Sequence, residues 1–226
     1  MRYPGVMTSS FSLRDIRGVL FDLDGTLVDS IELTTVSFLH ACRVHLGTEP
    51  SRAWVAATMG RPLIEALDEA APGRAAELFA TYVAHHDLHH DLLLRPFDEA
   101  LDAVHALHHR GLPLGIVTSK RRVAALRGLD LYHLTPLFTV VVALEDTARH
   151  KPLPDPLLHA ARGLDLPPPQ LLYIGDSVHD IRAAQAAGMP VAAALWGAGA
   201  EAELRALRPD AILARPDDMV RVTSDQ

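Results

Sequence analysis

The sequence has a single cysteine and no excess of positive charge, and each shortage excludes a class of protein. Cys42 has no second cysteine in the 226 residues, so an internal disulfide is excluded and a reducing cytoplasm is the simplest setting. Lys and Arg number 21 against 28 Asp and Glu, which gives a net charge of -7. That balance disfavours a nucleic-acid partner, because a nucleic-acid surface needs clustered positive charge.

Long apolar runs are also missing. None reaches the roughly 18 residues that suggest a membrane-spanning helix, so we expect no membrane partner. The stretch 1–17 carries several charged residues and no long apolar segment. We therefore predict neither a signal peptide nor an anchor there.

Short apolar runs alternate with longer helical patterns along most of the chain. This alternation is typical of βαβ units, and it predicts an α/β fold with a mostly parallel sheet. The strands are predicted at 19–23, 114–117, 140–143, 171–174, 191–195 and 211–213. The helices are predicted at 97–110, 122–129, 155–164, 178–187 and 201–207.

Residues 30–94 interrupt this rhythm. The stretch is helical in pattern throughout, with breaks at Gly47, Pro50, 60–62 and 72–73. An all-helical block between the first and second strands indicates an inserted domain. We therefore predict a core domain formed by 1–29 and 95–226 and a cap domain formed by 30–94. The two crossings between them would lie near 28–32 and 94–97.

Polar side chains follow four of the predicted strands, at the point where each strand ends. In open α/β sheets, ligands bind beyond the carboxyl ends of the strands, so these residues should converge on one edge of the sheet. In chain order they are Asp22 and Asp24, then Thr118 and Ser119, then Lys151, and finally Asp176 and Asp180.

The chemistry of these residues suits a phosphate ester. Asp22 and Asp24 are two positions apart, so both carboxylates could face the same way at a strand end. Thr118 can donate a hydrogen bond to a phosphoryl oxygen, and Lys151 adds a positive point charge. Asp176, together with Asp22, supplies the hard oxygen ligands that suit Mg²⁺. The pattern indicates a magnesium-assisted reaction at phosphorus.

Four sequence segments together resemble the motifs of a known superfamily. They are DLDGTLVDS at 22–30, TS at 118–119, KPLPDP at 151–156 and GDSVHD at 175–180. In this order, and with a helical block between the first and the second, they resemble the four motifs of the haloacid dehalogenase-like hydrolase superfamily. The resemblance runs from about residue 18 to 197, and it implies a Rossmann-like core with a small all-helical cap.

The resemblance also implies roles. Asp22 would form an aspartyl-phosphate, and Asp24 would act first as an acid and then as the base for the attacking water. The phosphoryl group would be held by Thr118, Ser119 and Lys151. By the same resemblance, the enzyme would be a phosphoric monoester hydrolase.

A metal site and a cap residue are implied in the same way. Mg²⁺ would be bound by the Asp22 carboxylate, the Asp24 backbone carbonyl and Asp176. Asp180 would either contact the metal or hold a residue that does. Arg61 lies between two predicted cap helices, where the resemblance places a loop that faces the substrate.

Several functions remain open within this reading. We expect a Mg²⁺-dependent phosphatase that acts on a small phosphorylated metabolite, similar to phosphoglycolate phosphatases. The alternatives are an inorganic pyrophosphatase of the same superfamily, a β-phosphoglucomutase-like phosphotransferase, and a catalytically silent binding module. Asp24 argues against a dehalogenase, whose pattern lacks an acid/base Asp at that position.

Two further segments have competing interpretations. The stretch HHDLHH at 85–90 repeats histidines one helical turn apart, which permits a metal site, but a solvated or partly buried helix face is the preferred interpretation. The run Lys120-Arg121-Arg122 could bring positive charge to the phosphate. It is equally typical of the solvated start of a helix, and we favour that interpretation.

Overall fold

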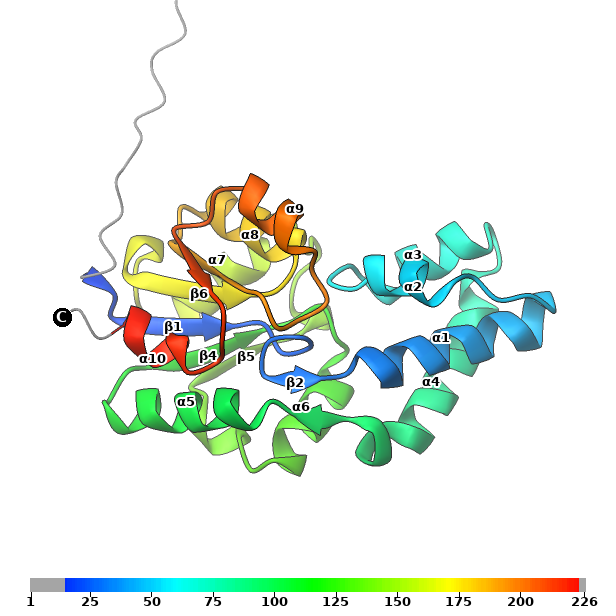
Figure 1. Ribbon diagram of the computed structural model, residues 1–226, viewed down its shortest axis with the longest axis horizontal. Helices are drawn as coiled ribbons and strands as arrows, with labels where there is room; N and C mark the ends of the chain where they lie inside the picture. The colour runs from blue at the N-terminus through cyan, green and yellow to red at the C-terminus, as the bar shows by residue number, and fades with distance from the viewer. Residues whose placement is uncertain (1–14, 224–226) are drawn as a thin grey trace, which may run out of the picture.

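A sheet of six parallel strands organises the computed structural model, which describes residues 15–223 (Figure 1). The strand order is β5-β4-β1-β6-β7-β8, so the connections run outward in both directions from β1. Such a reversal opens a crevice at the carboxyl end of the central strand. The strands are β1 (Gly18–Phe21), β4 (Leu114–Val117), β5 (Val140–Val142), β6 (Leu171–Gly175), β7 (Val191–Ala194) and β8 (Ala211–Leu213).

Helices cover both faces of this sheet because its strands are apolar on both sides. In β1, Val19 and Phe21 join one hydrophobic cluster and Leu20 joins the other. One face carries α5 (Asp98–His109), α6 (Arg122–Leu131) and α10 (Asp218–Val222). The other carries α7 (Asp155–Gly163), α8 (Val178–Ala187) and α9 (Glu201–Ala206). Short 3-10 turns lie at η2 (Thr135–Leu137), η3 (Leu144–Asp146) and η4 (Pro168–Gln170).

The predicted α/β fold with a Rossmann-like parallel sheet is confirmed, with small differences at the strand ends. β4 and β8 have the predicted bounds, whereas the first strand ends at Phe21 instead of residue 23. The chain turns away there because the backbone carbonyl of Leu23 accepts the amides of Thr26, Leu27 and Val28. These local hydrogen bonds replace the ladder of the sheet.

Four helices form a layer of their own beside the sheet. They are α1 (Ile31–Leu46), α2 (Arg52–Ala57), α3 (Leu63–Ala70) and α4 (Ala75–Leu93). Each contributes to one hydrophobic cluster, through Phe38, Val55, Leu67 and Leu78 respectively. In Figure 1 this helical layer joins the sheet through an antiparallel pair, β2 (Val28–Asp29) and β3 (Arg95–Pro96). The layer is the segment for which the sequence predicts a cap, and its behaviour as a separate domain stays a prediction.

Two expectations concern the start of the chain and membrane-spanning segments. Of the stretch 1–17, for which neither a signal peptide nor an anchor is predicted, residues 1–14 lie outside the described part of the chain. Within the described part, no helix combines the length and the apolar character that crossing a membrane requires.

Candidate active site

The loop after β1 places two carboxylates at the carboxyl end of the sheet. The amide of Asp22 still donates to the carbonyl of Ile174 at 2.9 Å, so Asp22 is held between β1 and β6. Gly25 then takes φ +84°, which turns the chain sharply. The hydroxyl of Thr26 donates to Asp176 Oδ1 at 3.2 Å. The first and fourth motifs, about 150 residues apart in the sequence, are thereby joined directly.

A buried ammonium lies between two of the predicted site carboxylates. Lys151 Nζ is 3.0 Å from Asp22 Oδ1 and 2.7 Å from Asp180 Oδ1. The hydroxyl of Tyr173 lies 3.1 Å from Lys151 Nζ and 2.8 Å from Asp180 Oδ1. Burial alone would lower the pKa of Lys151, but the charges of Asp180 and Asp22 outweigh it and raise the pKa. Lys151 is therefore a fixed positive charge beside Asp22.

Asp180 uses both of its oxygens in contacts within the protein. Oδ1 faces Lys151 and Tyr173, and Oδ2 accepts from the Ser177 amide at 3.0 Å and from the Ser177 hydroxyl at 2.5 Å. The Ser177 hydroxyl in turn accepts from the Asp180 amide, which closes a capping box at the start of α8. The sequence predicts Asp180 at or near a metal, and the structure places it where it holds Lys151.

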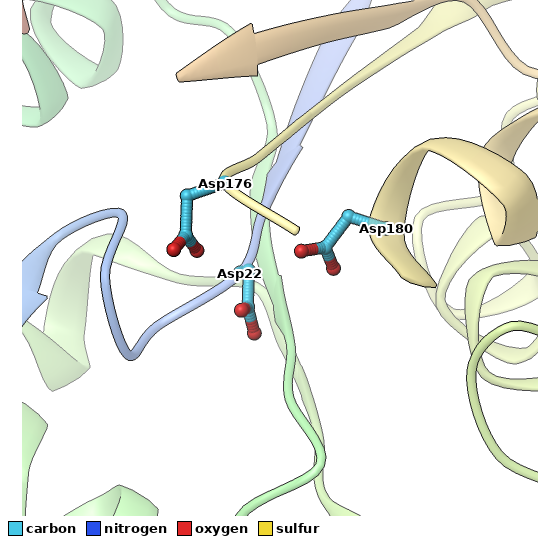
Figure 2. Close-up of side chains that lie close together, drawn as sticks. All are labelled: Asp22, Asp176 and Asp180. Carbon is cyan, nitrogen blue, oxygen red and sulfur yellow. The ribbon is translucent and has the colours of Figure 1, made fainter. Parts of the chain in front are cut away.

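Asp22, Asp176 and Asp180 form a compact group of buried carboxylates. Each offers an oxygen within 4.8 Å of the others, and Figure 2 shows them meeting from the end of β1, the end of β6 and the start of α8. Burial, with the charges of Asp180, Asp176 and Asp24, raises the pKa of Asp22 well above its usual range despite Lys151. Burial and the charge of Asp180 raise the pKa of Asp176 to about 7.

These carboxylates fit a divalent cation. Of these three buried carboxyl groups only Asp22 and Asp180 pair with the Lys151 ammonium, so the ionised cluster carries excess negative charge that is costly away from water. Hard oxygen ligands of this kind suit Mg²⁺. In residues 15–223, no other group of three side chains meets the same distance criterion, so the histidines of 85–90 do not form such a site.

A glycine makes this approach of the two loops sterically feasible. A Cβ atom on Gly25 would lie 2.3 Å from Asp176 Oδ2, and the residue has a positive φ. We expect Gly25→Ala to lower the free energy of unfolding by about 2 kcal/mol or more, and Mg²⁺ affinity by roughly 10-fold, because Asp176 must shift. Urea denaturation and a Mg²⁺ titration measure the two effects.

Gly47 provides the matched control. It has φ +69° at the end of α1, and a Cβ there would meet nothing within 4 Å. Gly47→Ala should cost about 1 kcal/mol of stability from backbone strain and leave the Mg²⁺ titration unchanged. Equal Mg²⁺ affinities in the two variants would contradict the steric role of Gly25.

The segment after β4 supplies a hydroxyl and a second ammonium. The hydroxyl oxygen of Thr118 accepts the Lys120 amide at 3.1 Å, so its proton is available to a ligand. Lys120 Nζ donates to Asp24 Oδ1 at 2.7 Å. Burial alone would raise the pKa of Asp24, but the Lys120 ammonium and hydrogen bonds from Lys120 and Ser30 lower it. The solvated position that the sequence favoured for Lys120 is wrong, since its side chain is 11% exposed.

A cavity of about 460 Å³ joins this cluster to the helical layer. Phe38, Phe79 and Tyr82 give it an apolar wall on the helical side. The predicted phosphate contact Ser119 also lines it, but its hydroxyl donates to the carbonyl of Gly60 at 3.0 Å and so ties the core to the helical layer.

Arg61, the predicted substrate contact, lines the same cavity. Its Nη2 donates to Glu69 at 2.8 Å, and its buried Nε has no hydrogen-bond partner among the described residues. A buried donor of this kind is costly unless a ligand or water accepts from it. The sequence offered Lys120 as a charge near the phosphate only as the less favoured interpretation, and it did not single out Tyr173. The position of Lys120 directly after Thr118-Ser119 was a readable signal, whereas Tyr173 looks like any buried strand residue.

Comparison with known proteins gives consistent matches over nearly the whole chain. The model of the haloacid dehalogenase-like hydrolase family matches residues 19–194. Pyrophosphatase PpaX of Halalkalibacterium halodurans is 36% identical over 208 residues, which cover 92% of this chain and 97% of that protein. These matches include both the sheet and the helical layer.

Solved structures of other proteins also match this chain over most of its length. The crystal structure of a predicted phosphoglycolate phosphatase from Haemophilus somnus has a TM-score of 0.86 at 24% identity, covering 93% of this chain and 99% of that one. A structure from Lactobacillus plantarum, provisionally described as a phosphoglycolate phosphatase, has a TM-score of 0.83 at 28% identity, covering 92% and 99%. The first likeness concerns the fold alone.

Proposed function

Because this chain belongs to the haloacid dehalogenase-like hydrolases, and a relative at 36% identity is named a pyrophosphatase, we propose that it hydrolyses a small phosphorylated metabolite through an aspartyl-phosphate on Asp22. The observation that carries the proposal is the position of Asp22. Asp22 directly follows the central strand β1, and its buried carboxylate contacts Lys151 at 3.0 Å and lines the cavity. A carboxylate beside a fixed cation and open to a ligand cavity is suited to nucleophilic attack.

The described side chains can perform both half-reactions. Asp22 attacks phosphorus, its bond to phosphorus forms as the bond to the leaving oxygen breaks, and Asp24 gives that oxygen a proton. Water then attacks phosphorus, Asp24 takes the water's proton, and the bond to Asp22 breaks to release phosphate. The Thr118 hydroxyl and the Lys151 ammonium stabilise the charge on the phosphoryl oxygens.

For the metal, we propose Mg²⁺ held by the carboxylates of Asp22 and Asp176 and by the Asp24 backbone carbonyl. When bound, it offsets the excess negative charge of the carboxylate group and polarises the phosphoryl group. Asp180 has both oxygens engaged by Lys151, Tyr173 and Ser177, so we assign it to holding Lys151 instead of ligating the metal.

Pyrophosphate is the first substrate candidate and phosphoglycolate the second. The relative at 36% identity is named a pyrophosphatase, while the structure at 28% identity is provisionally described as a phosphoglycolate phosphatase. A sugar phosphate transferred as by β-phosphoglucomutase ranks below both. A catalytically silent module is disfavoured, because every position that the chemistry needs is occupied.

A panel of phosphate-release assays tests the proposal. With Mg²⁺ present, we expect turnover of pyrophosphate or phosphoglycolate to exceed that of sugar phosphates and nucleotides. EDTA should abolish release and added Mg²⁺ should restore it, because the carboxylate group needs the cation. The Asp22→Asn protein, prepared in the same way, gives the background. Release no faster than that background with every compound would contradict the proposed function.

A further inference from the structure

We propose that Lys120 binds the leaving group of the substrate and holds Asp24 in place beside it, so that the enzyme prefers an anionic leaving group. This rests on the proposed function, since it assumes that Asp24 meets the leaving oxygen. Lys120 Nζ donates to Asp24 Oδ1 at 2.7 Å, and both residues line the cavity. An ammonium has three protons, so it can hold Asp24 and still donate to a ligand.

The two lysines of the site contact residues with different roles in the reaction. Lys151 contacts Asp22, the nucleophile, and its side chain is only 1% exposed. Lys120 contacts Asp24, the proton donor, and faces the cavity. In an in-line displacement, the nucleophile and the proton donor meet opposite ends of the scissile bond. Lys151 is therefore placed to bind the transferred phosphoryl group, and Lys120 is placed to bind the leaving group.

Lys120 is close enough to contact an anionic group that is bonded to the leaving oxygen. A leaving oxygen that is hydrogen-bonded to Asp24 Oδ1, which Lys120 contacts at 2.7 Å, falls within about 6 Å of Lys120 Nζ. In pyrophosphate, the second phosphoryl group is attached directly to this oxygen, and its anionic oxygens come within contact range. Neutral aryl or sugar leaving groups offer no charge at that position.

Local structure fixes Lys120 in this position. Its amide donates to the Thr118 hydroxyl oxygen at 3.1 Å, and its carbonyl accepts the Leu144 amide at 3.0 Å. One short loop after β4 thus carries both the hydroxyl that binds the transferred group and the ammonium that faces the leaving group. Their relative placement follows from two residues of backbone, and such preorganisation favours binding.

The other cations of the cavity are bound differently. Arg61 donates to Glu69 at 2.8 Å, and Arg121 lies 3.3 Å from Asp87 with its guanidinium over the ring of Phe79. Both carboxylates belong to the helical layer and are not assigned a chemical step. Among these three cations, Lys120 is the one whose described partner takes part in the proposed reaction.

The test compares two substrates with leaving groups of similar acidity and different charge. Dihydrogen phosphate and p-nitrophenol are acids of similar strength, so pyrophosphate and p-nitrophenyl phosphate differ mainly in the charge of the leaving group. The apolar wall of the cavity gives an aryl group a place to bind. We expect Lys120→Met to lower kcat/KM for pyrophosphate at least ~10-fold more than for the aryl ester. The loss should act chiefly through KM, because the anionic leaving group loses its contact with the Lys120 ammonium.

Matched variants make the result specific. Lys120→Arg should recover much of the lost preference for pyrophosphate, because the charge is kept. Arg122→Met removes a neighbouring cation that pairs with Asp146 and does not line the cavity, so the substrate ratio should stay at the wild-type value. Thermal melts report the folding of each variant, and Lys120→Gln serves if the Met variant does not fold.

Each outcome bears on the inference. An equal loss for both substrates in Lys120→Met and Lys120→Gln would overturn it, because Lys120 would then only orient Asp24. A wild-type enzyme that hydrolyses the aryl ester but no substrate with an anionic leaving group would also overturn it, while the proposed function stands. A wild-type enzyme that releases phosphate from neither substrate, nor from phosphoglycolate or the other compounds of the panel, would count against the proposed function itself.

Discussion

Asp22→Asn is expected to abolish phosphate release, lowering kcat by roughly 10⁴-fold or more, because an amide cannot replace the carboxylate as a nucleophile. The fold should survive. The substitution removes the charge of one of three neighbouring buried carboxyl groups, and Lys151 keeps its 2.7 Å contact with Asp180. We expect a melting temperature in EDTA no lower than that of the wild type. Steady-state kinetics and thermal denaturation measure the two quantities.

Asp29→Asn provides the control for this variant. Asp29 belongs to the same motif, but its carboxylate accepts the Ile31 amide at 3.0 Å at the start of α1 and does not line the cavity. Its replacement should leave kcat close to the wild-type value. Turnover that persists in Asp22→Asn, and also in Asp22→Ala, would remove Asp22 from the role of nucleophile.

Lys151→Met should have the largest effect on stability. The variant leaves Asp22 and Asp180 buried without their shared ammonium, and removing one partner of a buried ion pair typically costs about 3–5 kcal/mol. Turnover should also be lost, because the charge beside the phosphoryl group is gone. Urea denaturation in EDTA measures the free energy of unfolding, and the phosphate-release assay measures the turnover.

Tyr173→Phe separates the charge of Lys151 from the hydrogen bonding around it. The Tyr173 hydroxyl touches the same two groups, Lys151 Nζ at 3.1 Å and Asp180 Oδ1 at 2.8 Å, but it is uncharged. Its removal should cost about 1 kcal/mol. If Lys151→Met were no more destabilising than Tyr173→Phe, the buried ion pairs would not stabilise the fold as described.

Much of the fold could be predicted because its signals are local. β4 and α8 have the predicted bounds, and α8 begins directly after its N-cap Ser177 and ends directly before its C-cap Gly188, which takes φ +66°. The convergence of Asp22 and Asp176 also followed from topology, because parallel strands present their carboxyl ends at one edge. The all-apolar composition of β1 is consistent with its burial on both faces, where Val19 and Phe21 join one cluster and Leu20 the other.

The histidines of 85–90 show where local signals end. Their spacing of one helical turn permitted a metal site or a helix face. In the structure His86 and His90 are buried, while the ring of His85 stacks on His89 at 4.1 Å and on His40 at 4.4 Å. The partner His40 comes from α1, more than forty residues earlier. Which interpretation holds depended on how α1 and α4 pack, and no pattern within 85–90 carries that information.

The sequence by itself determined the parallel sheet, the helical block between its first strands and the set of residues that reach its carboxyl edge. Tertiary structure alone decided which ammonium meets which carboxylate. Lys151 holds Asp180 and Asp22, and Lys120 holds Asp24 across 96 positions of sequence at 2.7 Å. The physical reason is that the energy of a charge pair depends on a few ångströms of separation and on burial. Both quantities are set by packing between segments that are distant along the chain.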